Sequence, residues 1–147
     1  MRRFSNFTIV LFICTAVLVT MAISCSKEPA KMICGKWQCT SLLFRTDWQP
    51  EWVESITPEH DVSWEFRSDG TVINAENGII TGDYQGKWVF DEINNQIVIN
   101  NWMYLWIEEL TSQEMVLHEI RADNLGVATE RIHTLKRVKS IQYVNVD

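Results

Sequence analysis

The chain has 147 residues, of which 46% are hydrophobic and 22% charged, and its 13 basic residues face 19 acidic ones. The resulting net charge of -6 argues against nucleic acid as a partner, because phosphate binding requires clustered basic residues. The one basic cluster, LKRVK at 135–139, is too short to reverse this, and we interpret it as a solvated strand end.

The first 24 residues have the pattern of a secretory signal. Met1, Arg2 and Arg3 form a short basic head, and the run FTIVLFICTAVLVTMAI at 7–23 carries no charge. A basic head followed by an apolar segment that ends in small residues is typical of signal peptides. The run is also close to the shortest helix that crosses a bilayer, so an uncleaved membrane anchor is the alternative.

The residues that follow, AISC at 22–25 and then SKEP, favour cleavage. They resemble the lipobox of bacterial lipoproteins, and SKEP is similar to the lysine/acid signals of surface lipoproteins in the Bacteroides group. The resemblance implies a signal peptide at 1–24, acyl chains such as palmitate on Cys25, a tether at 25–31, and an outer-membrane protein facing the periplasm or the medium. Several acyl chains hold a protein on a membrane for practical purposes permanently, because each buried methylene contributes about 0.8 kcal/mol.

Residues 25–147 are enough for one domain with a real core, but not for two. Residues 1–24 hold two arginines and no acid, so their removal leaves a more acidic chain with a net charge of -8. We expect the folded domain at 32–140 and a C-terminal tail at 141–147.

Short apolar and aromatic runs alternate with polar turns along this domain. Asp69-Gly70 and Asn77-Gly78 are hairpin signals, because tight turns need the positive φ that glycine and asparagine adopt readily. With an opening strand near 34–44, the spacing predicts about eight antiparallel strands and an all-β fold. The exception is a short helical turn around Pro50 to Pro58. The remaining predicted runs are VSWEF, TVINA, YQGKWVF, QIVIN, WMYLWIEEL, EMVLHEIR and VATERIHTLKRV.

Alternation within the runs predicts which side chains point inward. Period two places Val62, Trp64 and Phe66 on one face, and it places Trp88 and Phe90 likewise. The same inner face continues through 97–117, at Ile97, Ile99, Met103, Leu105, Ile107, Met115 and Leu117. We expect Trp37, Trp64 and Trp88 at the centre of the core, each burying on the order of 200 Å².

The cysteines after Cys25 do not form a metal site or a disulfide in our interpretation. The spacing of Cys25, Cys34 and Cys39 does not match paired zinc ligands, and no histidine precedes His60. Positions five apart on a strand point to opposite faces, so Cys34 and Cys39 are expected as buried or half-buried thiols. An intermolecular bridge is the alternative.

The order of several motifs is similar to a known family. These are GKWQCTS at 35–41, WEFRSDGTV at 64–72, GKWVFDE at 86–92, NNQIVIN at 94–100 and LTSQEMVL at 110–117. Together they resemble the lipocalin-like domain of small Bacteroidetes lipoproteins. The resemblance implies an up-and-down barrel of about eight strands, with Trp37 closing one end. The segment 45–61 is long for a turn and is expected to act as a lid or as a plug.

A barrel of eight strands is filled by side chains or holds one small ligand. The first hypothesis is therefore a lipid-anchored envelope protein that binds a small apolar ligand. The second is a solid-core interaction or structural subunit that meets another envelope protein. We expect no enzyme, cofactor or metal, since no set of residues has the roles that chemistry requires. Ligand-binding residues are predicted at Trp37, Trp48, Trp52, Trp64 and Trp88.

Two further histidines were considered as candidate site residues. His118 falls on the face opposite Met115 and Leu117 and is expected as a solvated strand residue. His133 shows no better case for a site.

Overall fold

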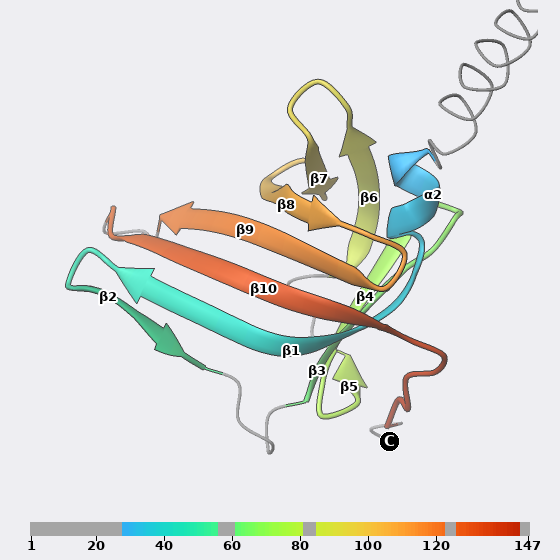
Figure 1. Cartoon of the computed structure of the whole chain (residues 1–147), viewed down its shortest axis with the longest axis horizontal. Helices are drawn as coiled ribbons and strands as arrows, with labels where there is room; N and C mark the ends of the chain where they lie inside the picture. The colour runs from blue at the N-terminus through green and yellow to red at the C-terminus, as the bar shows by residue number, and fades with distance from the viewer. Residues whose placement is uncertain (1–27, 56–60, 81–84, 123–125, 145–147) are drawn as a thin grey trace, which may run out of the picture.

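The computed structural model describes residues 28–55, 61–80, 85–122 and 126–144. These residues form one short helix and ten strands (Figure 1). The elements in chain order are α2 (Pro29–Ile33), β1 (Gly35–Thr46), β2 (Gln49–Glu54), β3 (Val62–Phe66), β4 (Thr71–Glu76), β5 (Ile79–Ile80), β6 (Gly86–Asp91), β7 (Gln96–Ile99), β8 (Met103–Leu110), β9 (Glu114–Ala122) and β10 (Ala128–Val138).

Eight of the strands close into an antiparallel barrel. Going round it, the order is β1, β3, β4, β6, β7, β8, β9 and β10, and β10 pairs with β1 to complete the circle. Each barrel strand thus lies beside its neighbours in sequence, apart from the short β2 and β5, which pair with β1 and β4 alone. The predicted all-β, up-and-down barrel of eight strands is confirmed.

The described part of the chain contains this barrel and its core together. Every core side chain lies between Ile33 and Leu135, and the strand pairings that close the circle lie between Gly35 and Val138. A segment that holds its own core behaves as a domain, so we expect the chain from Ser26 onward to fold by itself.

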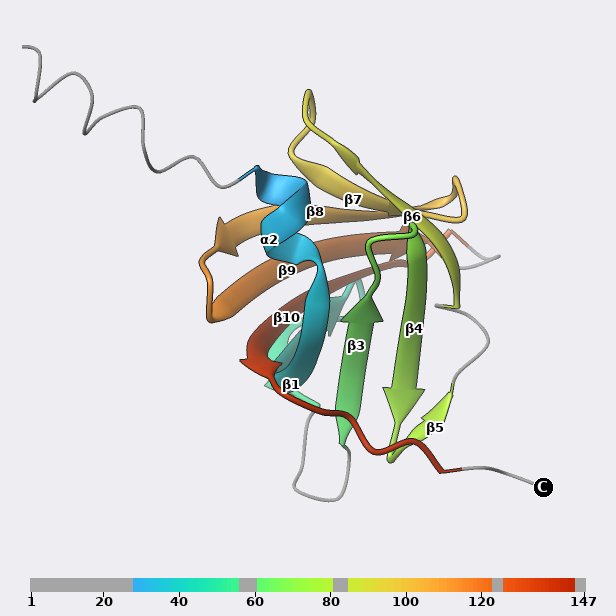
Figure 2. The same ribbon diagram turned by 90° about the vertical axis from the view of Figure 1, so that its right-hand side faces the viewer.

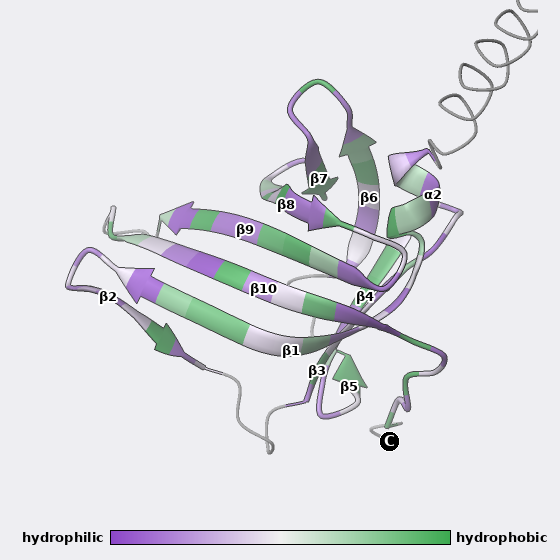
Figure 3. Cartoon of the chain, in the orientation of Figure 1, coloured by the Kyte–Doolittle hydropathy of each residue, from purple (hydrophilic) through white to green (hydrophobic). Residues whose placement is uncertain are grey.

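The predicted turns and inner faces account for most of this architecture. Asn77 and Gly78 have φ of 51° and 79°, and they join β4 to β5 as a tight hairpin. Trp64 and Phe66 are buried on β3, and the predicted inner residues of β7, β8 and β9 are buried as well. Bands of opposite hydropathy follow one another along β9 and β10 (Figure 3), as expected for strands with one wet face.

The segment predicted as a lid or plug at 45–61 is in part a hairpin, which corrects the sequence analysis. β1 continues to Thr46, and β2 turns back to pair with it through Phe44 and Val53. The strand covers Pro50, so the helical turn expected from there is absent between 50 and 54. Residues 56–60 lie outside the described residues. Tertiary pairing with the long β1 therefore overrides the loop composition of this segment.

Aromatic side chains fill one end of the barrel, and they include the three tryptophans that the sequence analysis expected at the centre of the core. Trp37 and Trp64 are paired across β1 and β3, and both are almost fully buried. Phe66 stacks on Trp64 with ring centroids 5.8 Å apart and meets Trp88 edge-on at 5.5 Å. Such contacts add about 0.5–1.5 kcal/mol each to the burial of the rings.

The helix α2 lies against β8 at this filled end (Figure 2). It begins at Pro29, inside the segment 25–31 for which the sequence predicted a tether. The buried Ile33 accepts a hydrogen bond from Trp37 Nε1 at 2.8 Å, so the helix is joined to the tryptophan that the resemblance expected at a barrel end.

Arg137 fastens α2 to the barrel, so the interpretation of LKRVK as a solvated strand end is wrong for this residue. Its guanidinium lies 4.1 Å from the ring centre of Trp37. It donates to the carbonyl oxygens of Cys34 at 2.9 Å and Ser112 at 2.7 Å, and also to that of Met32. Arg137 can make these hydrogen bonds from the end of β10 because its long side chain reaches back over the end of the sheet.

The two described cysteines are free thiols, as expected. Cys39 is buried on β1, and Cys34 is half-buried at the end of α2. Burial raises the pKa of Cys39 to about 12. Burial raises the pKa of Cys34 as well, so both thiols are poor nucleophiles at neutral pH.

Candidate functional site

A cavity of about 430 Å³ lies at the end of the barrel opposite α2. It is partly open to solvent, and it occurs where the pairing between β8 and β9 stops. The last pair is Leu105 with Glu119, so Met103 and Tyr104 pair only with β7, and Ile120–Ala122 pair only with β10. The lining residues are Trp102, Met103, Tyr104, Glu119, Ile120, Arg121, Ala122, Thr129 and Arg131.

The rim of the cavity is largely aromatic and apolar. Trp102 and Tyr104 are 52% and 42% exposed, and Ile120 is 50% exposed, so the three form a partly exposed apolar surface at the opening. Large apolar groups held half in water at the mouth of a cavity are typical of a surface that contacts another molecule.

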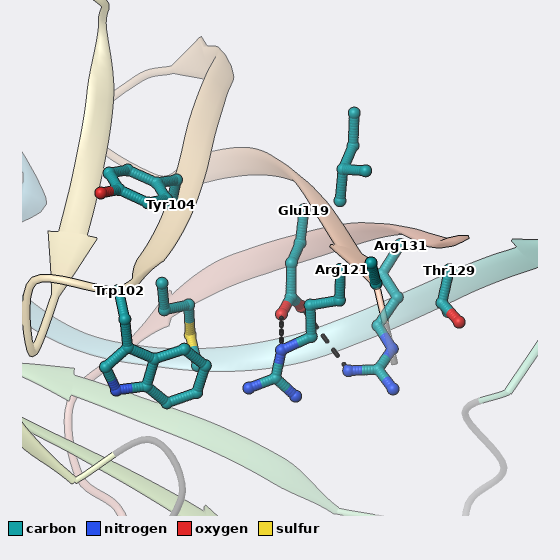
Figure 4. Close-up of a pocket in the computed structure, with 9 residues that line it drawn as sticks. Trp102, Tyr104, Glu119, Arg121, Thr129 and Arg131 are labelled. Atoms are coloured by element: carbon teal, nitrogen blue, oxygen red, sulfur yellow. Dashed lines mark ion pairs between the residues drawn. The ribbon is translucent and has the colours of Figure 1, made fainter. Parts of the chain in front are cut away.

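The inner wall carries a cluster of charges around Glu119. This carboxylate is fully buried, and it accepts a hydrogen bond from His133 Nε2 at 3.1 Å. Arg121 Nε lies 2.8 Å from Glu119 Oε1, and Arg131 Nη1 lies 3.7 Å from Oε2. Figure 4 shows both guanidinium groups beside the Glu119 carboxylate within the cavity wall.

The electrostatics of the cluster follow from this arrangement. Burial alone would raise the pKa of Glu119, but the hydrogen bond from His133 and the positive charges of His133, Arg121 and Arg131 outweigh it. The pKa of Glu119 therefore lies below its ordinary value, and the residue is ionised at neutral pH.

The local sequence explains why these four residues converge. On β9 the inward positions run from Met115 through Leu117 and Glu119 to Arg121, so the inner face changes from apolar to charged toward the cavity. On β10 the residue directly opposite Glu119 is Arg131. Opposite charges facing each other across two strands attract, which fixes the pair in place.

Sequence reasoning missed this cluster, although a signal was present. Period two from Met115 and Leu117 continues to Glu119 and Arg121, and the same step from Leu135 leads to His133 and Arg131. His133, for which the sequence offered no better case for a site, is buried against Glu119 and does not line the cavity. His118 lies on the outer face as predicted, half-buried between Glu108 at 3.4 Å and Glu130 at 3.3 Å.

The five tryptophans predicted to bind ligand do not gather in one place. Trp37, Trp64 and Trp88 fill the end of the barrel beneath α2. Trp48 and Trp52 lie outside, on the β1–β2 turn and on β2, and are 83% and 38% exposed. None of the five lines the cavity, and their role in ligand binding stays a prediction.

A second hollow of about 240 Å³ lies beside the β1–β2 turn. Its walls include Arg45 and Glu130, which form an ion pair at 2.8 Å. Arg45 also covers the ring of Trp52 at 4.5 Å. The hollow is smaller than most small-molecule pockets, which start at about 300 Å³.

Other predicted features fall partly outside the described residues, which exclude Cys25 and His60. Within residues 28–55, 61–80, 85–122 and 126–144, no group of three histidine, cysteine or acidic side chains could hold a metal ion. In the same parts of the chain, no helix combines the length and apolar character needed to cross a membrane.

The chain is similar to two solved structures. Bovine odorant-binding protein, as a deswapped triple mutant, has 15% sequence identity and a TM-score of 0.44, with 76% of this chain and 77% of that chain covered. Lobster apocrustacyanin A1 has 16% identity and a TM-score of 0.34, with 82% and 66% covered. No family model matches the sequence. No curated protein matches it either. The barrel is established by the strand pairings of this chain and not by its similarity to these two structures.

Proposed function

We propose that this protein is a small-ligand-binding barrel held at a cell-envelope membrane by a lipid on Cys25. The observation that carries the binding function is the cavity of about 430 Å³ at the charged end of the barrel. Pockets for small molecules measure about 300–1,000 Å³ and combine apolar walls with a few polar groups. This cavity has that size and both kinds of wall.

The walls favour a small hydrophobic ligand that also carries a polar group. Trp102 and Tyr104 at the rim offer flat apolar surfaces, while Arg121 and Arg131 offer hydrogen-bond donors further in. A purely apolar ligand would remove water from the partly exposed arginine side chains, and this loss of solvation disfavours its binding.

The binding function is tested with a neutral fluorescent probe, N-phenyl-1-naphthylamine, and the chain from Ser26 onward. We expect saturable binding with enhanced probe fluorescence and loss of binding in Thr129→Trp, because Thr129 lines the cavity. Val89→Trp is the matched control, since Val89 is 58% exposed on β6 and does not line it. If neither this probe nor octanol nor octanoate binds, the binding function is refuted.

The lipid anchor rests on the signal pattern and the AISC motif at 22–25. We expect the full chain to incorporate an alkyne analogue of palmitate in bacterial cells and to fractionate with membranes. Cys25→Ala should lose both properties, whereas Cys34→Ala should keep them. Labelling that persists in Cys25→Ala would contradict the anchor.

A second function, as an interaction subunit of the envelope, is favoured by the exposure of β2. This strand pairs only with β1 among the described residues, and its turn carries Trp48, which is 83% exposed. Exposed strand edges with aromatic residues are common at protein contacts. In intact cells, a site-specific cross-linker at position 48 should then capture one partner. Capture should fail from position 93, where Ile93 is even more exposed, at 93%.

A further inference from the structure

The turn between β6 and β7 carries the most exposed large hydrophobic side chain in the described part of the chain. Ile93 is 93% exposed, and Trp48 follows with 83%. Turns are built mainly from small and polar residues, a role that Asn94 and Asn95 fill here. A single exposed apolar side chain is common on protein surfaces, so its support and its position decide whether it has a role.

The carboxylate of Asp91 holds this turn in one shape. Its Oδ1 accepts hydrogen bonds from the backbone N–H groups of Ile93 at 3.0 Å and Asn94 at 3.3 Å. Its Oδ2 accepts from the side-chain amides of Asn94 at 2.7 Å and Gln96 at 3.1 Å. An apolar group on a turn that is already ordered loses little conformational entropy when it becomes buried against a partner.

The turn is also fastened to the end of the barrel that carries α2. Asn95 Nδ2 donates to the Ile107 carbonyl oxygen at 2.8 Å, and the Ile107 N–H donates to the Asn95 carbonyl oxygen at 3.0 Å. Ile107 belongs to β8, the strand that α2 contacts. Figures 1 and 2 show the β6–β7 turn rising past α2 in both views. The turn is therefore a fixed projection at the end where the chain enters the domain.

The length of the chain before α2 limits how far this end can lie from a membrane. Four residue steps separate Cys25 from Pro29, the first residue of α2. Even fully extended, they span at most about 14 Å. A lipid on Cys25 would thus keep the start of α2, and with it the projecting turn, close to the bilayer surface.

We propose that Ile93 inserts into the lipid surface on which the chain is anchored, as a second membrane contact beside the lipid on Cys25. This inference rests on the proposed lipid anchor, and it adds a contact site made by the folded domain itself. Glu92, next to Ile93, is exposed as well, so the contact depends on burial of the apolar side chain and not on attraction between opposite charges. Two contacts at one end hold the barrel in one orientation, whereas a tether alone does not.

The contribution of Ile93 is measured on the chain from Cys25 onward, coupled through its N-terminal cysteine to one myristoyl group. One such chain binds membranes only weakly and reversibly, so an added contact changes the partition measurably. In sedimentation with phosphatidylcholine vesicles, Ile93→Ser should weaken the partition about tenfold, as expected for a large aliphatic side chain that loses its burial. Ile93→Trp should partition at least as well as the unmodified sequence, because tryptophan favours the membrane interface.

Ile79→Ser is the matched control for the vesicle measurement. Ile79 is 48% exposed on β5, which pairs with β4 at Glu76, the end of that strand away from the β3–β4 turn. Its replacement should leave the partition unchanged. Equal partition of Ile93→Ser and Ile79→Ser would overturn the insertion. Because the side chain of Ile93 is almost fully exposed, its replacement does not disturb the core.

The contact in cells is tested with a diazirine amino acid at position 93 of the full chain. Irradiation should attach phospholipid there, detected by mass spectrometry, and none at position 79. Capture of a protein at position 93 in place of phospholipid would overturn the inference. If Cys25 is acylated but position 93 captures no phospholipid, the anchor stands and the insertion fails. If Cys25 is not acylated, the proposed anchor fails, whereas the vesicle measurement brings its own acyl chain and still decides whether Ile93 inserts.

Discussion

Removing the guanidinium of Arg137 tests whether the filled end of the barrel depends on it. In Arg137→Met the carbonyl oxygens of Met32, Cys34 and Ser112 lose a charged donor. The contact with the Trp37 ring, at 4.1 Å, is lost as well. Hydrogen bonds to a charged group contribute about 1.5–3 kcal/mol and a cation on a ring about 0.5–2 kcal/mol. Arg137 is only half-buried and water can replace part of this, so we expect a loss of about 3–5 kcal/mol.

Urea unfolding followed by tryptophan fluorescence measures the change, with the chain from Ser26 onward. A loss of this size corresponds to a fall in Tm of roughly 10–20 °C for a domain of this length. Arg137→Lys should lose about half as much, because one ammonium group cannot reach three carbonyl oxygens in different directions. Arg67→Met is the control, since its ion pair with Glu65 is exposed to solvent and contributes little to stability. A loss from Arg137→Met no larger than that of the control would refute the reasoning.

Three further predictions follow from the same contacts. Gly35→Ala should destabilise the domain by about 2 kcal/mol or more in urea unfolding, because its φ is +143° and a Cβ would lie 2.1 Å from Arg137 Nη1; wild-type stability would contradict the close approach. In the native state iodoacetamide should alkylate Cys34 faster than Cys39, because Cys39 is buried and its pKa of about 12 leaves little thiolate. Mass spectrometry measures both rates, and equal rates would contradict the prediction. The free energy of unfolding should fall as the pH drops below 4.5, the ordinary value for glutamate, because the lowered pKa of Glu119 stabilises the fold above that pH and the contribution is lost as the residue protonates. Urea midpoints that stay constant down to pH 3 would exclude this contribution, and Glu119→Gln should show a shallower decline.

The barrel could be predicted because the sequence pattern that produces it is local and recurs in each strand. Alternation along β3 and β8 and the turn pairs Asp69-Gly70 and Asn77-Gly78 are visible without any long-range contact. The large aromatic residues Trp37, Trp64 and Trp88 were predicted at the core for the same reason. Period two decides which face is inward, and size decides what is buried there.

The remaining features depend on contacts that no local pattern contains. The strand β2 forms because β1 is long enough to pair with it after β3 has ended, which composition around Pro50 does not reveal. Arg137 is separated from Cys34 by 103 positions, so its contact with α2 appears only when the barrel closes. The short helix of five residues has too few turns for a helical period to be recognised.

The charged cavity could be recognised in part. Alternation assigns Glu119, Arg121, Arg131 and His133 to the inner face, but a sequence does not say that β9 and β10 bring them opposite one another. It also does not say where β8 stops pairing with β9, and this gap creates the cavity. The tryptophans were predicted to bind ligand because of their size, yet Trp37, Trp64 and Trp88 lie in the core beneath α2 rather than in the lining of the cavity.

The position of α2 gives the barrel a direction. The chain enters the domain through Pro29, at the filled end of the barrel. Arg137 connects α2 there to β10, which pairs with β1. If the chain is held by the proposed lipid on Cys25, the attachment point lies at the end of the barrel opposite the cavity, and dissolved molecules have a shorter path to the cavity than molecules embedded in the lipid.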